Sequence, residues 1–323
     1  MFSKKFLETG FVFLTAGIIS PQDVILLIIC KLFDINVDEY NIHICLIIGI
    51  LLIVIGLIMY YKESKENHTL SIIGLDNMNY ITKIKNLLTI NIIDDCKNIK
   101  KSNSKLIISG YVKNIKEKIS NYISYKISYF GVAPLPFIAI AGKYYRKVNI
   151  VNHYEYHQKD DKILPLKRKK LFFNEKLKCE EKNNNSNIAV ITIETTTRIN
   201  NEDLKQFNNA NFFRFYLENA RTNAIVYEKQ LEDYSETIAD TIYKISKTDI
   251  EKIYILGACQ SSLVFEVFRR LNDNRIKEII VCNYKAKSKN KYNWGISVYN
   301  ENDNEKYVKL GSDICGQNQK INE

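Results

Sequence analysis

Residues 129–157 read YFGVAPLPFIAIAGKYYRKVNIVNHYEYH, and this stretch decides how the rest of the chain is understood. The pattern predicts a short strand, a turn at Gly131, an apolar helix over 135–147, and a second strand that ends in aromatic and polar residues. Pro134 and Pro136 fit a helix start, because the first N–H groups of a helix have no partner within it. A helix start after a glycine turn is a ready phosphate site, although most such turns serve packing alone.

The composition is that of a folded protein with a basic surface. Apolar residues make up 46% of the 323 residues, charged residues 25%, and the formal net charge is +10. This length suits two domains, or one domain with a membrane anchor. The charge suits an anionic partner such as a nucleotide, a nucleic acid or an anionic lipid, but the lysines are scattered, which is also typical of ordinary solvated surface.

The cysteines argue against a disulfide framework and against a zinc site. The chain has seven of them, an odd number, and no two have CxxC spacing. Such usage fits a reducing cytoplasm. We also expect no metal site and no cofactor.

An apolar run over residues 42–61 predicts a transmembrane helix. It has 20 residues without a formal charge, which is the length that a helix needs to cross the hydrocarbon core. Residues 10–32 are also apolar but are interrupted at 20–23, so they form either a second, kinked span or a re-entrant or interfacial pair of short helices. We prefer two spans with both ends cytoplasmic, because lysines flank the pair and acidic residues lie between them.

Beyond a short polar linker, the chain reads as two similar halves. TLSIIGLD corresponds to IAVITIETTT, YFGVAPLPFIAIAGKYY to YILGACQSSLVFEVFRR, and VNIVNHYEY to EIIVCNYKA. Apolar periodicity predicts long helices over 108–127 and 220–247. The predicted fold class is therefore α/β, with two Rossmann-like halves whose sheets are mostly parallel, preceded by an α-helical membrane segment.

These patterns also set the domain boundaries. We predict a transmembrane segment over 1–62, a first half over 63–183, a second half over 184–300 and a polar, frayed tail over 301–323. Ligands of such sheets bind at the carboxyl ends of the strands. Two halves that face one another would present two helix starts to one shared ligand carrying several phosphates.

The order of these motifs resembles the SAVED domain, two fused CARF-like halves found in bacterial anti-phage CBASS systems. The matching pieces are YFGVAPLPFIAIAG, VNHYEYH, ITIETTTRI, YILGACQSSLVFEVFRRL and VCNYKAKSKNKYNWGISV, within residues 69–299. The second turn of the family often holds a proline, whereas this chain has Cys259-Gln260-Ser261. The resemblance implies that the domain binds a cyclic oligonucleotide made by a partner nucleotidyltransferase, and that the protomers then stack and activate a fused effector.

For this chain, the resemblance implies a membrane effector without enzymatic activity. The sequence shows no histidine–metal nuclease motif, so the implied effector is the pair of transmembrane helices. The protein would lie in the bacterial inner membrane with its C-terminal domain in the cytoplasm. A ligand-induced homo-oligomer would disrupt the lipid bilayer and cause abortive infection, and no direct binding of DNA or RNA is expected.

The implied ligand contacts come from both halves of the repeat. Backbone contacts to phosphate would come from Gly131, Val132, Ala133, Gly257, Ala258 and Cys259. Hydroxyls would come from Thr195, Thr196, Thr197 and Ser261, and positive charge from Lys143, Arg198 and Lys285. Base stacking would use Tyr129, Tyr154, Tyr156, Tyr284 and Trp294. Packing in the core is the plain alternative for any one tyrosine, because the chain has 21 of them.

Two other function classes stay open. His153, Glu155 and His157 alternate onto one face of a strand, which permits a membrane-tethered nuclease that degrades a cyclic oligonucleotide, although no nucleophile or third metal ligand is evident. The other class is a membrane scaffold without a nucleotide ligand, in which the glycine turns are purely structural.

Overall fold

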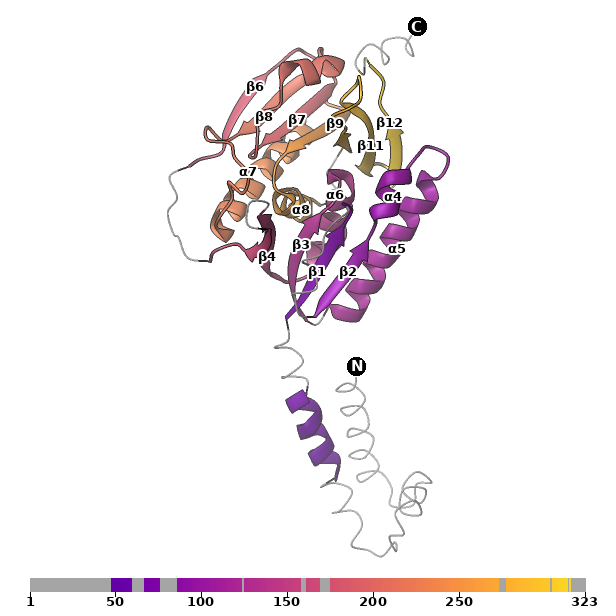
Figure 1. Cartoon of the computed structure of the whole chain (residues 1–323), viewed down its shortest axis with the longest axis vertical. Helices are drawn as coiled ribbons and strands as arrows, with labels where there is room; N and C mark the ends of the chain where they lie inside the picture. Colours follow the sequence, from indigo (N-terminus) through magenta and orange to yellow (C-terminus); the bar gives the residue numbers. More distant parts are fainter. Residues whose placement is uncertain are drawn as a thin grey trace, which may run out of the picture. The chain divides into compact units, whose positions relative to one another are not determined.

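The structure is a computed structural model, shown in Figure 1. It describes residues 48–59, 67–75, 86–123, 125–157, 161–168, 175–272, 277–302, 304–312 and 314. The chain divides into two compact units, Met1–Asn67 with Ser124–Lys126, and His68–Ile123 with Ile127–Glu323.

In the first unit, the described residues include a helix over residues 48–59. This helix falls within the predicted span over 42–61, whose ends lie outside the described residues, as does the whole of 10–32. Among the described residues, no helix combines the length and the apolar character that crossing a bilayer requires.

A five-stranded sheet forms from the first half of the sequence repeat. Its strand order is β2-β1-β3-β4-β5. The strands are β1 (Asn67–Ile73), β2 (Leu87–Asn91), β3 (Lys126–Val132), β4 (Ile150–His157) and β5 (Lys162–Pro165). β1 pairs with β2, and β3 with β4, in parallel, whereas β5 turns back antiparallel to β4.

A seven-stranded sheet, in the order β12-β11-β10-β9-β7-β8-β6, forms from the predicted second half together with β6 and β12, which lie outside its predicted bounds of 184–300. The strands are β6 (Lys178–Lys182), β7 (Ile188–Glu194), β8 (Asn211–Tyr216), β9 (Lys252–Ala258), β10 (Glu278–Tyr284), β11 (Tyr292–Tyr299) and β12 (Lys306–Lys309). The four central strands are parallel, but β6, β11 and β12 are antiparallel to their neighbours. The prediction of mostly parallel sheets is therefore correct only for the centre, and the fold is mixed α/β.

Four of the helices form a layer in the order α5-α6-α8-α7 (Figure 1). Their bounds are α5 (Ser104–Tyr122), α6 (Leu135–Tyr144), α7 (Glu228–Ser246) and α8 (Ser261–Arg270). A short α4 (Ile93–Asn98) precedes α5, a 3-10 turn η2 (Tyr145–Lys147) follows α6, and η3 (Asn201–Phe207) follows β7. α6 and α8, one from each half, pack closely because Gly142 has no Cβ, and a Cβ there would collide with the Phe265 carbonyl.

The helix that we predicted over 220–247 starts later, at Glu228. Tyr227 and Gln230 form a capping box at its start, which satisfies N–H groups that the first turn leaves unpaired. The preceding backbone is bonded elsewhere: the N–H groups of Leu217 and Arg221 donate to Glu194 and Thr195. These bonds compete with helix formation, and apolar periodicity does not reveal them.

The predicted polar tail over 301–323 contains ordered structure, which corrects its description as frayed. β12 pairs antiparallel with β11, and Tyr307 stacks on Trp294 with ring centroids 5.8 Å apart. Leu310 is buried beyond it. The segment is held because it covers the edge of β11 and gives Trp294 an aromatic partner.

Candidate functional site

The two predicted glycine turns lie against each other where α6 and α8 begin. In each half the glycine precedes the first helical residue by four positions, Gly131 before Leu135 and Gly257 before Ser261. The Ser261 hydroxyl donates a hydrogen bond to the Gly131 carbonyl at 2.5 Å. A methyl group of Leu135 fills the place that a Cβ on Gly257 would take. Each helix therefore starts against the glycine of the other half, as a two-fold relation between the halves requires.

The helix starts offer fewer N–H groups than the sequence analysis expected. Pro134 and Pro136 have no N–H group at the start of α6. At the start of α8, the Ser262 N–H donates to the Glu155 carboxylate at 3.1 Å, so a buried side chain of the protein takes part of the anion site. Glycine, proline and this carboxylate show that much of the local sequence serves packing.

The hydroxyl-rich turn after β7 lies beside the end of β9. Both the N–H and the hydroxyl of Thr196 donate to the Ala258 carbonyl, at 2.9 and 2.7 Å. Thr195 is fully buried, and its hydroxyl has no hydrogen-bond partner among the described residues. Thr197 is exposed. The turn thus joins the paired helix starts and carries a buried polar atom that a bound molecule or a water could satisfy.

Aromatic side chains stand at equivalent strand ends in the two halves. Tyr156 is the last residue but one of β4, beside β3, and Tyr284 ends β10, beside β9. Tyr284 is 46% exposed, whereas Tyr156 is half-buried and its hydroxyl donates to Asp161 at 2.7 Å. Lys285 is exposed directly after Tyr284. These positions remain accessible at the rim of the paired turns.

Several other predicted contacts are partly accessible. Half-buried backbone or side chains are found at Val132, Ala133, Tyr154, Ala258 and Cys259. Burial raises the pKa of the Cys259 thiol well above its usual range, so this cysteine is protonated at neutral pH.

Three predicted ligand contacts belong to the core, which corrects their assignment. Tyr129 is fully buried and stacks on Phe265 with centroids 3.7 Å apart. Trp294 is 8% exposed and stacks on Tyr307. The Lys143 ammonium is buried and donates to the Val298 carbonyl at 3.0 Å and to Glu305 at 3.1 Å. None of these groups is available to a ligand in this structure.

Arg198 points toward the strand ends of β7 and β8. Its Nε lies 2.9 Å from Glu194, and its guanidinium covers the Tyr216 ring at 3.7 Å. Glu194 is fully buried and also binds Arg214 and Thr192. Arg198 is thus an ion-pair partner whose side chain is still 41% exposed.

A loop between β8 and α7, largely within the stretch predicted as a helix over 220–247, connects the two halves at this site. The side chain of Gln260 bonds both the N–H and the carbonyl of Ile225, at 2.6 and 3.1 Å. Asn223, with φ +55°, donates to the Tyr156 carbonyl at 3.3 Å. The loop also presents Arg221, whose side chain is 53% exposed. It follows β8, whose aromatic-rich sequence NFFRFY is the one signal that could have indicated a strand and a following loop here.

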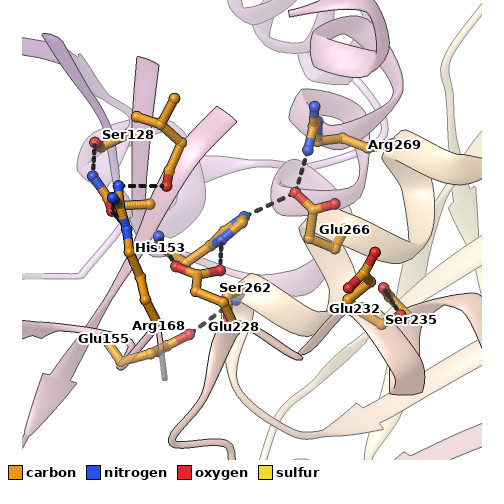
Figure 2. Close-up of polar contacts among 12 residues, drawn as sticks. Ser128, His153, Glu155, Arg168, Glu228, Glu232, Ser235, Ser262, Glu266 and Arg269 are labelled. Atoms are coloured by element: carbon orange, nitrogen blue, oxygen red, sulfur yellow. Dashed lines mark hydrogen bonds and ion pairs between the residues drawn. The ribbon is translucent and has the colours of Figure 1, made fainter. Parts of the chain in front are cut away.

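A buried ion network lies behind the paired helix starts (Figure 2). The two ring nitrogens of His153, on β4, lie 2.7 Å from Glu228 and 2.8 Å from Glu266, which belong to α7 and α8. Arg269 pairs with Glu266 as well. Burial alone would lower the pKa of His153, but the two carboxylates more than offset it and raise the pKa to about 9. His153 is therefore a cation that ties the two halves together.

The pKa values of Glu155 and Glu266 shift in opposite directions, because burial is offset by hydrogen bonds and charges to different extents at the two carboxyl groups. Burial raises the pKa of Glu155 to about 7, because the bond from Ser262 offsets only part of the desolvation. Burial also acts to raise the pKa of Glu266, but the bonds and charges of His153 and Arg269 lower it to about 2. His153 and Glu155 share the buried face of β4, as the alternation predicted.

This network does not resemble a catalytic site. A histidine that is protonated at neutral pH and bound by two carboxylates is a poor general base. Among the described residues, no group of three His, Cys, Asp or Glu side chains is placed to hold a metal ion. A cavity of about 840 Å³ opens onto His153, and several of its charged lining residues, such as Glu228, Lys229 and Arg269, are already held in ion pairs.

Comparison with known proteins identifies relatives of this fold. A family model described as "SMODS-associated and fused to various effectors sensor domain", SAVED, matches residues 110–298. No curated protein sequence matches.

Two similar solved structures are of the Acinetobacter baumannii Cap4 SAVED/CARF-domain containing receptor. The complex with 2'3'3'-cAAA has a TM-score of 0.51 at 14% identity, over 78% of this chain and 57% of that chain. The complex with 3'3'3'-cAAA has a TM-score of 0.52 at 13% identity, over 78% and 58%. This chain therefore spans under three fifths of that receptor's length, and the likeness shows the fold.

Proposed function

This chain belongs to the SAVED family of sensor domains, and from that premise we propose that it is a sensor of a cyclic oligonucleotide in bacterial anti-phage defence. Residues 110–298, which match the family, contain both glycine turns, the hydroxyl-rich turn and the aromatic strand ends. The Cap4 receptors with the same fold are described with cyclic trinucleotides bound, which makes a cyclic oligoadenylate the first ligand to test.

One observation carries the proposal: the reciprocal contact between the two helix starts. Ser261 bonds Gly131, and Leu135 packs on Gly257, so two equivalent strand ends and helix starts form a single surface. A ligand with repeating phosphates and bases matches a surface with repeating contacts. The half-buried backbone near Ala133 and Ala258, the exposed hydroxyl of Thr197, and Tyr284 are the groups that would contact it.

The second part of the proposal concerns the effector. The apolar residues before position 63 would place the protein in the inner membrane, with the sensor in the cytoplasm. A ligand that binds the assembled form more tightly shifts the chain toward that form. Assembly would gather the apolar segments of several copies and disrupt the bilayer, which would stop growth of the infected cell without any enzymatic step.

The nuclease alternative has less support. It needs a free base or a metal near the ligand, and His153 is held between two carboxylates. The scaffold alternative remains, because the glycines of both turns are explained by packing. The two can be separated from the sensor by measuring binding and ligand integrity together.

The test is a binding measurement on the full-length protein in detergent micelles. We would record its melting temperature with a panel of cyclic di-, tri- and tetranucleotides that includes both cyclic trinucleotides named above. A sensor melts at a higher temperature with one of them, because a ligand that binds only the folded state stabilises it. A well-folded chain that responds to none of them would favour the scaffold.

Substitutions at two exposed positions test where the ligand binds. Thr197→Glu and Lys285→Glu place negative charge at the rim and should each lower affinity at least tenfold, without lowering the melting temperature of the free protein. Thr248→Glu, at an exposed threonine after α7, is the matched control for the added charge and should leave ligand affinity unchanged. Disappearance of the cyclic nucleotide during incubation would instead support the nuclease.

A further inference from the structure

The helices α5 and α7 occupy equivalent places in the two halves but have opposite charge. Each has 19 residues and precedes the strand that leads into a paired helix start. In Figure 1 they lie on opposite sides of the α6–α8 pair. The exposed charged residues are Lys105, Lys113, Lys116 and Glu117 on α5, and Lys229, Glu232, Glu236, Asp240 and Lys244 on α7. One end of the helix layer is therefore basic and the other acidic.

A basic groove extends the charge of α5. A cavity of about 1020 Å³ lies between α5, the end of α6 with η2, and residues 304–307. Its basic lining residues are Lys105, Lys113, Lys116, Lys143, Arg146, Lys147 and Lys306. The acidic lining residue Glu305 is neutralised by Lys143 at 3.1 Å. The groove therefore keeps a positive surplus that attracts a partner with an acidic surface.

The outer face of α5 has a second feature that its own protomer does not explain. Gly110 lies in the interior of the helix, where glycine costs about 1 kcal/mol relative to alanine. A Cβ added there would meet nothing within 4 Å, so no described residue requires the glycine. One turn earlier, Leu106 is 77% exposed. An apolar side chain beside a missing Cβ is the surface that a closely approaching helix would cover.

We propose that this face of α5, with Leu106, Gly110 and Lys113 at its centre, binds the acidic outer face of α7 in a second copy of the chain. The inference deepens the ligand-driven assembly of the proposed function by naming the two surfaces that meet. α7 brings Glu236 and Asp240 to the lysines of α5. Two helices of 19 residues can lie together over about 28 Å.

The contact is heterologous, because the two surfaces that meet are different. Each added copy leaves one α5 face and one α7 face uncovered at the ends of the assembly, so it can continue to grow. Copies related head to tail need not be inverted.

The test uses charge reversal in the full-length protein in detergent micelles. The basic-face variant is Lys113→Glu with Lys116→Glu, and the acidic-face variant is Glu236→Lys with Asp240→Lys. Lys176→Glu with Lys182→Glu is the control, since both lysines are exposed and lie on neither helix. Sedimentation is measured at 50 and 500 mM NaCl, with and without 3'3'3'-cAAA, and melting temperature is recorded for every variant.

With 3'3'3'-cAAA, the wild-type chain and the control should assemble at 50 mM NaCl and dissociate at 500 mM NaCl. Each single-face variant should need at least tenfold more protein to assemble, because like charges then meet. Combining all four substitutions in one chain, or mixing the two variants in equal amounts, should restore assembly. A symmetric α5–α5 contact would be disrupted by the basic-face variant alone, which would overturn the inference.

The remaining outcomes separate this inference from the proposed function. A wild-type chain that shows a ligand-induced melting shift but stays monomeric overturns the inference and leaves the sensor intact. Assembly with restoration by charge exchange, but without any ligand response, supports the interface and counts against the sensor. If the basic-face variant loses binding to anionic lipid vesicles or to a single-stranded oligonucleotide but assembles normally, the groove serves those partners and the inference is wrong.

Discussion

At the scale of single residues, His153 shows how one side chain can join three elements. It extends from β4 to Glu228 on α7 and Glu266 on α8, and all three side chains are wholly or largely buried. Removing one partner of a buried ion pair leaves the other charge without compensation, which costs about 3–5 kcal/mol. His153 therefore acts on stability, whereas its position in the sequence suggested chemistry.

His153→Gln should lower stability by about 3 kcal/mol at pH 6 and should remove a pH dependence. The folded pKa of His153, about 9, is above its unfolded value, so its contribution is complete below about 6.5 and disappears as the pH rises through 9. Thermal unfolding between pH 6 and 9.5 measures both effects. His157→Gln, at a half-buried position on the same strand, is the control. A wild-type curve that is flat over this range would contradict the assignment.

Lys143 was predicted to bind phosphate, but its ammonium is held by Glu305 and the Val298 carbonyl. Lys143→Met should therefore lower stability by about 3 kcal/mol, because Glu305 would stay partly buried without its partner. Ligand affinity should change less than twofold. Urea unfolding and the melting-shift titration distinguish the two effects, with the exposed Lys287→Met as control. A tenfold loss of affinity at unchanged stability would reinstate the original prediction.

At the scale of elements, the sequence predicted the strands and helices around residue 131 well. β3, α6 and β4 all formed where prolines, glycine and alternation indicated. Periodicity does not determine where a helix begins when a loop can bond elsewhere, as at α7. The strands β5, β6 and β12 were missed because they are short, largely exposed and carry little apolar pattern, as Lys178–Lys182 shows. β8 was missed although its sequence NFFRFY is rich in aromatic residues, which favour strands.

Two helical glycines give a paired prediction. Gly142→Ala should destabilise the protein by about 1–3 kcal/mol, because the new methyl group would meet the Phe265 carbonyl, which belongs to the backbone of α8 and cannot move alone. Gly110→Ala should stabilise the protomer by about 0.5–1 kcal/mol, because the site is open and alanine favours a helix. Chemical unfolding of both variants under identical conditions tests the pair. If the two substitutions changed the free energy of unfolding equally, α6 and α8 would be less closely packed at Gly142 than the structure shows.

At the scale of the whole molecule, the sequence repeat predicted that two helix starts would meet. It could not predict which side chains pack between them. The repeat sets the positions of Gly131 and Gly257, because equivalent elements of the two halves lie in equivalent positions. The side chains that pack beside each glycine come from the other half. Leu135, Ser261 and Glu155 each cross between halves, and such pairings are invisible until both halves are in place.

Glu155 gives a test of this crossing. The folded pKa of Glu155, about 7, lies above its unfolded value, so folding favours the protonated carboxyl. The contribution of Glu155 to the free energy of unfolding is therefore complete below about pH 4.5 and is lost as the pH rises through 7. Glu155→Gln keeps an acceptor for the Ser262 N–H and carries no charge. The variant should match the wild type near pH 5 and exceed it by about 2 kcal/mol at pH 8, measured by urea unfolding. Lower stability of the variant at both pH values would mean that the ionised carboxylate is favoured.

The contacts that cross between the halves have a practical consequence. The connection between β5 and β6 joins two parts of the chain, and each part lacks something that the other provides: a hydroxyl for Gly131, a carboxylate for Ser262, a cation for Glu266. Cutting the polypeptide there should give two fragments that are unstable alone and recombine when produced together. Fused to the halves of a reporter enzyme, such fragments would report inside a living cell whether the sensor has been completed.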